Sequence, residues 1–183
     1  MSKINPTCPT DCDSLVPEVL YDFCGPNYDF GQITKLYVAK QSAASFTDVS
    51  DLSEWLARLS DDGTADDDIR TLNVIGSKEA PDSSEIQISL KRTIRTPKKH
   101  TVSVKIEETN LTNYEFMRAM DCGGTYKVWY ESGKYLYGGT EGIDAQILMH
   151  LLIPESTDEL KVFEGMIKWE DKYEPEACLN PFA

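Results

Sequence analysis

Histidine, which often carries out chemistry in proteins, is rare in this chain. There are only two histidines, His100 and His150. A histidine acts as an acid, a base or a metal ligand together with a partner side chain, and the sequence shows no such partner beside either one. His150 lies between large apolar residues at positions 148–152. This setting favours a histidine hydrogen-bonded in or beside the core over a ligand or a base.

The five cysteines are an odd number at scattered positions, unlike the paired framework of a small secreted domain. We therefore expect reduced thiols. Cys8, Cys12 and Cys24 could offer three thiolates to a zinc ion, but C-x3-C without a second close pair departs from the usual zinc spacings. Cys122 precedes two glycines without the surroundings of a cysteine protease nucleophile, so the glycines are better interpreted as the end of a helix.

Five aspartates gather at residues 61–68, and such a density of carboxylates resembles a cation site. The run lacks the D-x-[DN]-x-[DN]-G spacing of a calcium loop, which favours a solvated loop. The sequence also contains no phosphate-binding glycine loop, no G-x-S-x-G and no H-E-x-x-H. Because catalysis needs a recognisable set of partner residues, we predict a chain that is not an enzyme and that uses no metal or cofactor.

The net charge of −13, from 18 basic and 31 acidic residues, repels phosphate backbones and anionic lipids. A protein that grips duplex DNA is therefore disfavoured. The charge is uneven, because residues 91–105 contain six basic residues and no acid, which leaves −19 for the rest of the chain. The N-terminus leads into no apolar segment of a secretion signal, and no apolar run approaches the ~18 residues of a membrane span. We expect no membrane partner.

The length of 183 residues predicts one domain with a core of ordinary size. Residues 1–30 contain four prolines and little periodicity, which predicts an extended N-terminal arm. The domain is expected over 31–170, and residues 171–183, with two prolines, are expected to form an extended tail.

Strand and helix patterns appear from residue 32 onward. Alternation over 32–40 predicts a strand with Leu36 and Val38 on one face. The stretch 51–59 places Leu52, Trp55, Leu56 and Leu59 at helical spacing, with Ser50 or Asp51 as the N-cap. We predict a short helix that Leu52, Trp55 and Leu59 anchor on a sheet.

The stretch from Glu85 to Glu108 predicts one long β-hairpin that turns at residues 96–99. Its apolar residues alternate near the base, and its end is basic, so we expect the tip to project without a core beneath it. The residues expected to contact a neighbouring subunit are Arg92, Arg95, Lys98, Lys99 and His100.

The remaining patterns complete a mainly β chain. Residues 111–120 predict a second helix, with a capping box from Thr112 to Glu115 and a hydrophobic staple from Leu111 to Phe116. Further strands are expected over 70–76, 125–137 with a turn at 131–134, 143–153 and 161–169. The predicted fold class is a β-sandwich or barrel with two short helices and a long projecting β-hairpin.

The order of these elements resembles phage tail-tube proteins and tail-tube-like neck proteins. The relevant stretches are GQITKLYVAK at 31–40, FTDVSDLSEWLARL at 46–59 and FEGMIKWE at 163–170. The first two are similar to virion proteins of crAss-like and related phages of gut bacteria. This resemblance implies a homo-oligomeric ring around a DNA channel, adjacent to other tail or neck proteins, in a virion assembled in the cytoplasm of the bacterial host. DNA would pass through such a ring without being bound specifically.

Two other functions stay open at the level of sequence. One is a cytoplasmic β-sandwich binding module whose basic hairpin holds an acidic ligand or a nucleic acid. The other is a metal-dependent enzyme built on the cysteine-bearing arm or on the acidic loop. A ring component forms multimers, whereas a binding module can stay monomeric.

Overall fold

The computed structural model describes residues 31–59, 67–83, 85–89, 92–120, 122–156 and 158–183, with only the backbone at 88–89 and 92–95. The N-terminal arm with Cys8, Cys12 and Cys24, and most of the acidic loop, therefore lie outside the described residues.

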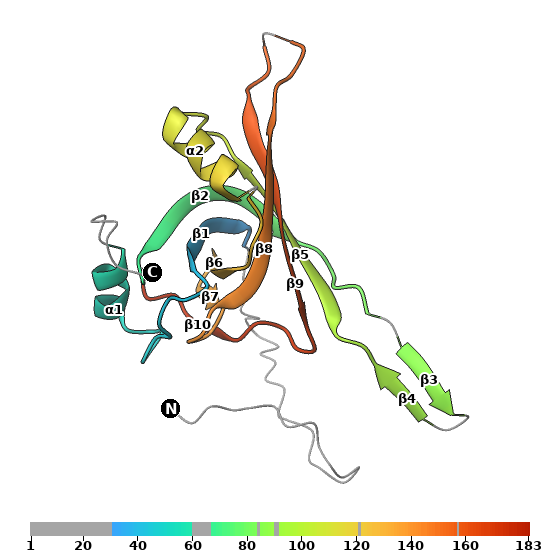
Figure 1. The fold of residues 1–183 in the computed structure, drawn as a ribbon. Coiled ribbons are helices and arrows are strands. Elements are labelled where there is room, and N and C mark those ends of the chain that lie inside the picture. Colours follow the sequence, from blue (N-terminus) through green and yellow to red (C-terminus); the bar gives the residue numbers. More distant parts are fainter. Residues whose placement is uncertain (1–30, 60–66, 84, 90–91, 121, 157) are drawn as a thin grey trace, which may run out of the picture.

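The centre of the molecule is a closed barrel of six antiparallel strands (Figure 1). Around the barrel, the strands are β1 (Ile33–Lys40), β2 (Ile69–Lys78), β5 (Lys98–Ile106), β9 (Val162–Asp171), β8 (Ile143–Leu152) and β6 (Tyr126–Ser132). The barrel closes because β6 also pairs with β1, from Ile33 opposite Ser132 to Lys40 opposite Tyr126. Two short strands, β7 (Tyr135–Tyr137) and β10 (Ala177–Leu179), extend the sheet beyond β6. The prediction of a mainly β fold with two helices is confirmed.

The interior of the barrel is a packed apolar core. Each wall strand turns alternate residues inward, such as Leu36 and Val38 on β1 and Val102 and Val104 on β5. The helix α2 (Leu111–Met120) contributes Met117 and Met120 to the same core. This core fills the space between the wall strands.

A second core lies outside the barrel, against β1 and β6. There α1 (Leu52–Arg58) and the C-terminal residues cover the outward side chains of the wall. The ring of Trp55 is 5.0 Å from Tyr37, 4.4 Å from Phe46 and 5.6 Å from Phe182, measured between centroids. Because both faces of β1 are covered, Tyr37 is as fully buried as Leu36.

The predicted C-terminal tail is part of this covering layer. Strand β10 pairs with β7, and the ring of Phe182 stacks on Tyr37 at 5.4 Å. The side chain of Asn180 donates a hydrogen bond to the buried carboxylate of Glu131 at 3.2 Å. The segment from 177 to 183 therefore packs on its own domain.

Both helices lie where the sequence predicts them, but only one has the predicted cap. The side chain of Asp51 accepts a hydrogen bond from the backbone of Ser53 at 2.9 Å, as expected for the N-cap of α1. For α2 the cap is Asn110, whose side chain accepts from the backbone of Asn113 at 2.8 Å. The capping box at Thr112 is therefore wrong by two residues. Leu111 is exposed instead of stapling the helix.

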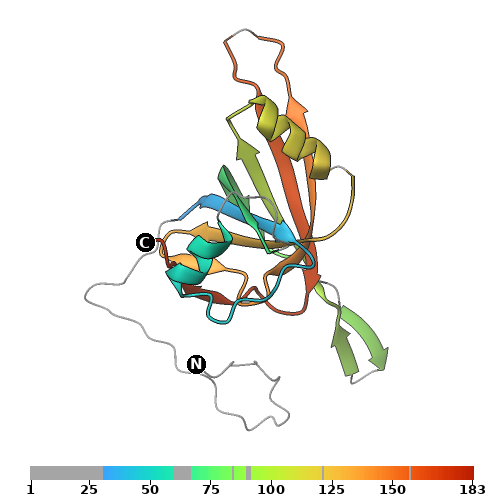
Figure 2. The ribbon, with the colours of Figure 1, turned by 60° about the vertical axis from the view of Figure 1, so that its left-hand side comes forward.

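The largest difference from the sequence prediction concerns residues 85–108. The chain forms a short hairpin of β3 (Glu85–Ser89) and β4 (Arg92–Arg95), and then re-enters the barrel as β5. Strand β5 pairs with β9 along its whole length and with β2 over 102–105. The single turn at 96–99 is therefore wrong, because the apolar alternation of β5 belongs to a barrel wall that has partners on both sides. Within residues 85–108, the part that projects from the barrel is the hairpin of β3 and β4 (Figures 1 and 2).

Candidate functional site

Two strand pairs extend beyond the barrel in different directions. The β3–β4 hairpin forms its own two-stranded sheet, and Ile86 on it is 57% exposed. The β8–β9 pair continues past α2 to a loop in which Ile153 and Leu160 are exposed (Figure 2). An isolated two-stranded hairpin is marginally stable in water, so a partner that covers it would add stability.

The five residues expected at a subunit interface do not stay together. Arg92 and Arg95 begin and end β4 on the projecting hairpin. Lys98, Lys99 and His100 instead open β5, where they pair in register with residues 169–171 at the end of β9. The amino group of Lys99 lies 3.8 Å from the carboxylate of Glu170.

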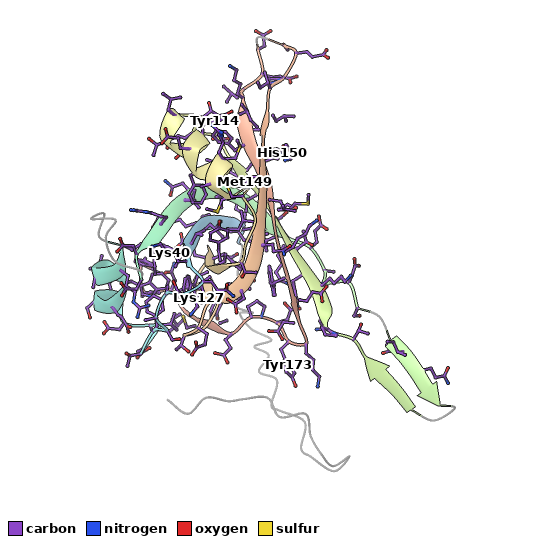
Figure 3. All side chains as sticks on the ribbon, in the orientation of Figure 1. Lys40, Tyr114, Lys127, Met149, His150 and Tyr173 are labelled. Carbon is purple, nitrogen blue, oxygen red and sulfur yellow. The ribbon has the colours of Figure 1, made fainter. Side chains whose placement is uncertain are left out.

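The two histidines exchange the environments predicted for them. His100, expected at an exposed tip, has a side chain with 0% exposure and stacks on Trp169, with ring centroids 4.9 Å apart. His150, expected in or beside the core, is 61% exposed on the outer face of β8. Met149, its neighbour in the sequence, is buried, so these two labelled residues of Figure 3 occupy opposite faces of the strand. Extending the inward alternation of Val102 and Val104 by one step would have placed His100 correctly.

Charged side chains gather at the end of the barrel where β5 begins and β9 finishes. Lys78 donates a hydrogen bond to the carboxylate of Glu174 at 2.7 Å. Lys98 and His100 approach the same carboxylate, to 3.9 Å and 3.8 Å. Burial alone would raise the pKa of Glu174, but the hydrogen bond from Lys78 and the nearby positive charges hold it below its ordinary value. Glu174 is thus an anion surrounded by basic groups.

Beside this cluster, a cavity of about 490 Å³ opens at the barrel mouth. Its walls include Ile33, Lys78, Tyr130, Tyr137 and Glu174. The rings of Tyr130 and Tyr137 stack at 4.9 Å between centroids. Burial raises the pKa of Tyr130, and Tyr137 and Glu174 raise it further, so its phenol stays neutral. No local pattern could have united these residues, because they come from separate strands and from the segment after β9.

A buried carboxylate elsewhere has a structural role. Glu131, on β6, accepts hydrogen bonds from Thr34 at 2.9 Å and from the phenol of Tyr37 at 3.2 Å, in addition to the one from Asn180. Lys35 lies 3.4 Å away. Burial, followed by the charge of Glu131, raises the pKa of Tyr37. These contacts join β1, β6 and the C-terminal segment, so the carboxylate of Glu131 stabilises the fold.

The three predicted core anchors behave differently from one another. Trp55 is fully buried, and its indole donates a hydrogen bond to the backbone oxygen of Val49 at 2.9 Å. Leu59 packs against the second core, whereas Leu52 is 40% exposed. Arg58 lies inward instead, with its guanidinium 4.1 Å from the ring centre of Phe46 and hydrogen-bonded to the backbone of Ser45. Apolar spacing alone could not have identified a buried arginine.

Metal-ligating residues are dispersed over the described part of the chain. Among those residues, no three histidine, cysteine or acidic side chains are grouped so that they could hold a metal ion. Cys122 is exposed, and Cys178 is a half-buried free thiol whose pKa is raised by burial and by Asp48. Within the same residues, neither helix has the length and apolar character needed to cross a membrane.

Comparison with known proteins returns no relative, since no family model, no curated protein and no solved structure matches this chain.

Proposed function

We propose that this chain is a non-catalytic structural protein that assembles with copies of itself and with neighbouring proteins through the strand pairs that leave its barrel. The observation that carries this proposal is the β3–β4 hairpin, which forms a separate two-stranded sheet and whose described side chains, at 85–87, are exposed. Ordering a hairpin in solvent costs conformational entropy, and burial against a partner would offset this cost.

The charges of the two projections support contacts between copies. The β3–β4 hairpin begins and ends its second strand with arginines, Arg92 and Arg95. The loop between β8 and β9 carries Glu155, Asp158 and Glu159. Surfaces of opposite charge steer association and fix the orientation of the partners. A contact between unlike surfaces of successive copies generates rings or tubes.

At a finer level, we propose a ring or tube component of a phage particle, either in the tail tube or in the neck. The support is the resemblance of residues 31–59 and 163–170 to such proteins, together with the acidic character of the chain. An acidic wall around a channel repels passing DNA, so the genome would move without sticking. The assembled protein would belong to the virion, and assembly would take place in the cytoplasm of the bacterial host.

The alternative function, a binding module whose basic hairpin holds an acidic ligand, has less support. Two of the basic residues predicted for that hairpin, Lys98 and Lys99, lie in the barrel wall near carboxylates of the same chain. Their charges are therefore partly neutralised without an external ligand.

Deleting the hairpin tests the proposal. Replacing residues 85–95 with a short glycine and serine linker should leave the fold intact, because Glu85 and Arg95 are paired neighbours at the base of the hairpin. We expect the wild type to form multimers or rings at high concentration, by light scattering and electron microscopy, and the deletion variant to stay monomeric with an unchanged melting temperature. Equal assembly of both proteins would exclude the hairpin from the interface, and a strictly monomeric wild type would refute self-assembly.

A further inference from the structure

We propose that the mouth of the barrel binds the anionic group of a small organic molecule, a carboxylate or a phosphate, whose ring or apolar body lies against Tyr130 and Tyr137. This site is independent of the proposed assembly, because its residues come from the barrel mouth and from the segment after β9.

The basic groups at the barrel mouth outnumber the carboxylate that they share. Three of them, Lys78, Lys98 and His100, converge on the single carboxylate of Glu174. The nearby carboxylate of Asp171 accepts a hydrogen bond from the backbone of Tyr173 at 3.0 Å, and Glu170 lies beside Lys99. One carboxylate cannot saturate two ammonium groups and an imidazole, since each ammonium alone has three donors. A second anion would therefore find free donors.

His100 lies next to this shared carboxylate. Its side chain has 0% exposure, and within the described part of the chain neither ring nitrogen has a hydrogen-bond partner. Buried polar groups without partners are rare because each one costs free energy. His100 also lines a second cavity, of about 580 Å³, together with Trp169, Lys99 and Lys168. It does not line the mouth cavity, but its Nδ1 lies 3.8 Å from the carboxylate of Glu174, which does, so an anion in the place of this carboxylate would be within reach of His100.

The mouth cavity has the size and the lining of a ligand pocket. A volume of about 490 Å³ lies within the range of pockets that hold small organic ligands. The stacked Tyr130 and Tyr137 form one wall, and Ile33 and Pro175 add apolar surface. Aromatic walls favour a planar or apolar body, while Lys78 at the rim favours an acidic group on that body.

Glu174 occupies the place of the incoming anion. Its side chain is 51% exposed and lies on the segment after β9, so it can leave without opening the barrel core. A bound ligand would take over the hydrogen bond from Lys78. Removing the charge of Glu174 should therefore strengthen ligand binding, which is opposite to the usual effect of deleting a polar group in a binding site.

The test uses benzoate and phenyl phosphate as probes, with uncharged benzamide as the matched control ligand. Binding is followed by chemical shifts of the His100 imidazole, in wild type, Glu174→Gln, Lys78→Gln and Lys105→Gln. Lys105 makes an ion pair of the same 2.7 Å length with Glu164 on the outer face, so its variant controls for general loss of charge. We expect Glu174→Gln to tighten anion binding about tenfold and Lys78→Gln to weaken it by a similar factor, because hydrogen bonds to charged groups are strong. Lys105→Gln should leave it unchanged.

The outcomes separate the alternatives. Binding of benzoate alone or of phenyl phosphate alone would define the anion, and either result supports the site. Equal binding of benzamide, absence of any His100 shift in both wild type and Glu174→Gln, or an affinity that ignores Glu174 and Lys78 would overturn the proposal. If Lys78→Gln fails to fold, Lys98→Gln serves in its place, since its amino group is more distant from Glu174 and more exposed.

Discussion

The outside of the barrel differs between two regions. We call the exterior of β1 and β6 the covered face and the exterior of β8 and β9 the open face. Outside β1 and β6, aromatic residues lie under α1 and the C-terminal segment, and Trp129 on β6 is completely buried. Outside β8 and β9, most outward residues are exposed, and the facing apolar pairs Leu148–Met166 and Leu152–Val162 lie among polar neighbours. The difference arises from the outward residues of the strands, because Tyr37, Ala39 and Trp129 on β1 and β6 join the second core, whereas most outward residues of β8 and β9 are polar. The same closed sheet thus carries a second core on one side and a solvent face on the other.

The largest loss of stability is expected from a substitution on the covered face. Replacing Trp55 with alanine should destabilise the monomer by ~3–5 kcal/mol, because a fully buried indole leaves a cavity and loses its hydrogen bond to Val49. Urea unfolding at constant m-value measures the change. Leu148→Ala on the open face is the matched control and should change stability by less than about 0.5 kcal/mol. Wild-type stability of Trp55→Ala would mean that the second core contributes little to the fold.

Glycine substitutions test how closely the covered face is packed. Gly142 has φ of 75°, and a Cβ there would lie 2.7 Å from the indole of Trp129. Gly123, after α2, has a similar φ of 78° with nothing within 4 Å of the added atom. Gly123→Ala should therefore cost only the backbone term of ~1–2 kcal/mol, and Gly142→Ala clearly more, by thermal or urea unfolding. Equal losses would show that Trp129 moves aside freely.

The sequence could predict many of the strands and helices of this fold, but not which distant segments lie side by side. The alternation of apolar residues predicted the strands, the existence of a barrel or sandwich and the helix around Trp55. It could not select the partner of β5, because Val102 and Val104 fit a hairpin with residues 86–90 as well as a wall beside β9. The choice depends on contacts between residues far apart in the chain. The mouth cluster was invisible for the same reason, since Lys78 and Glu174 are 96 positions apart.

The C-terminal segment that crosses the barrel mouth should give a pH-dependent contribution to stability. The pKa of Glu174 is lower in the folded protein than in the unfolded chain, so its contribution is present above the unfolded pKa and is lost as pH falls through the folded pKa. At neutral pH, Glu174→Gln should cost a few tenths to about 1 kcal/mol, because the exposed side of the pair is screened by solvent. The difference from wild type should shrink to zero in acid, measured by urea unfolding from pH 7 to pH 3. A difference that stays constant with pH would assign the loss to packing.

Substitutions on the open face should change the stability of the monomer least. They test instead whether copies of the chain pack through this face. Leu148 and Met166 face each other across β8 and β9 and are partly exposed, at 48% and 39%. The double change Leu148→Ser with Met166→Ser should alter monomer stability by less than about 1 kcal/mol, because each side chain keeps much of its surface in water. If copies pack through this face, the same variant should form fewer multimers in light scattering, whereas Leu56→Ser, an exposed leucine on α1, should not. Loss of assembly in both variants would indicate nonspecific association. Unchanged assembly of the double variant would leave the contacts between copies to the projecting strand pairs, and would make the open face a plain solvent surface.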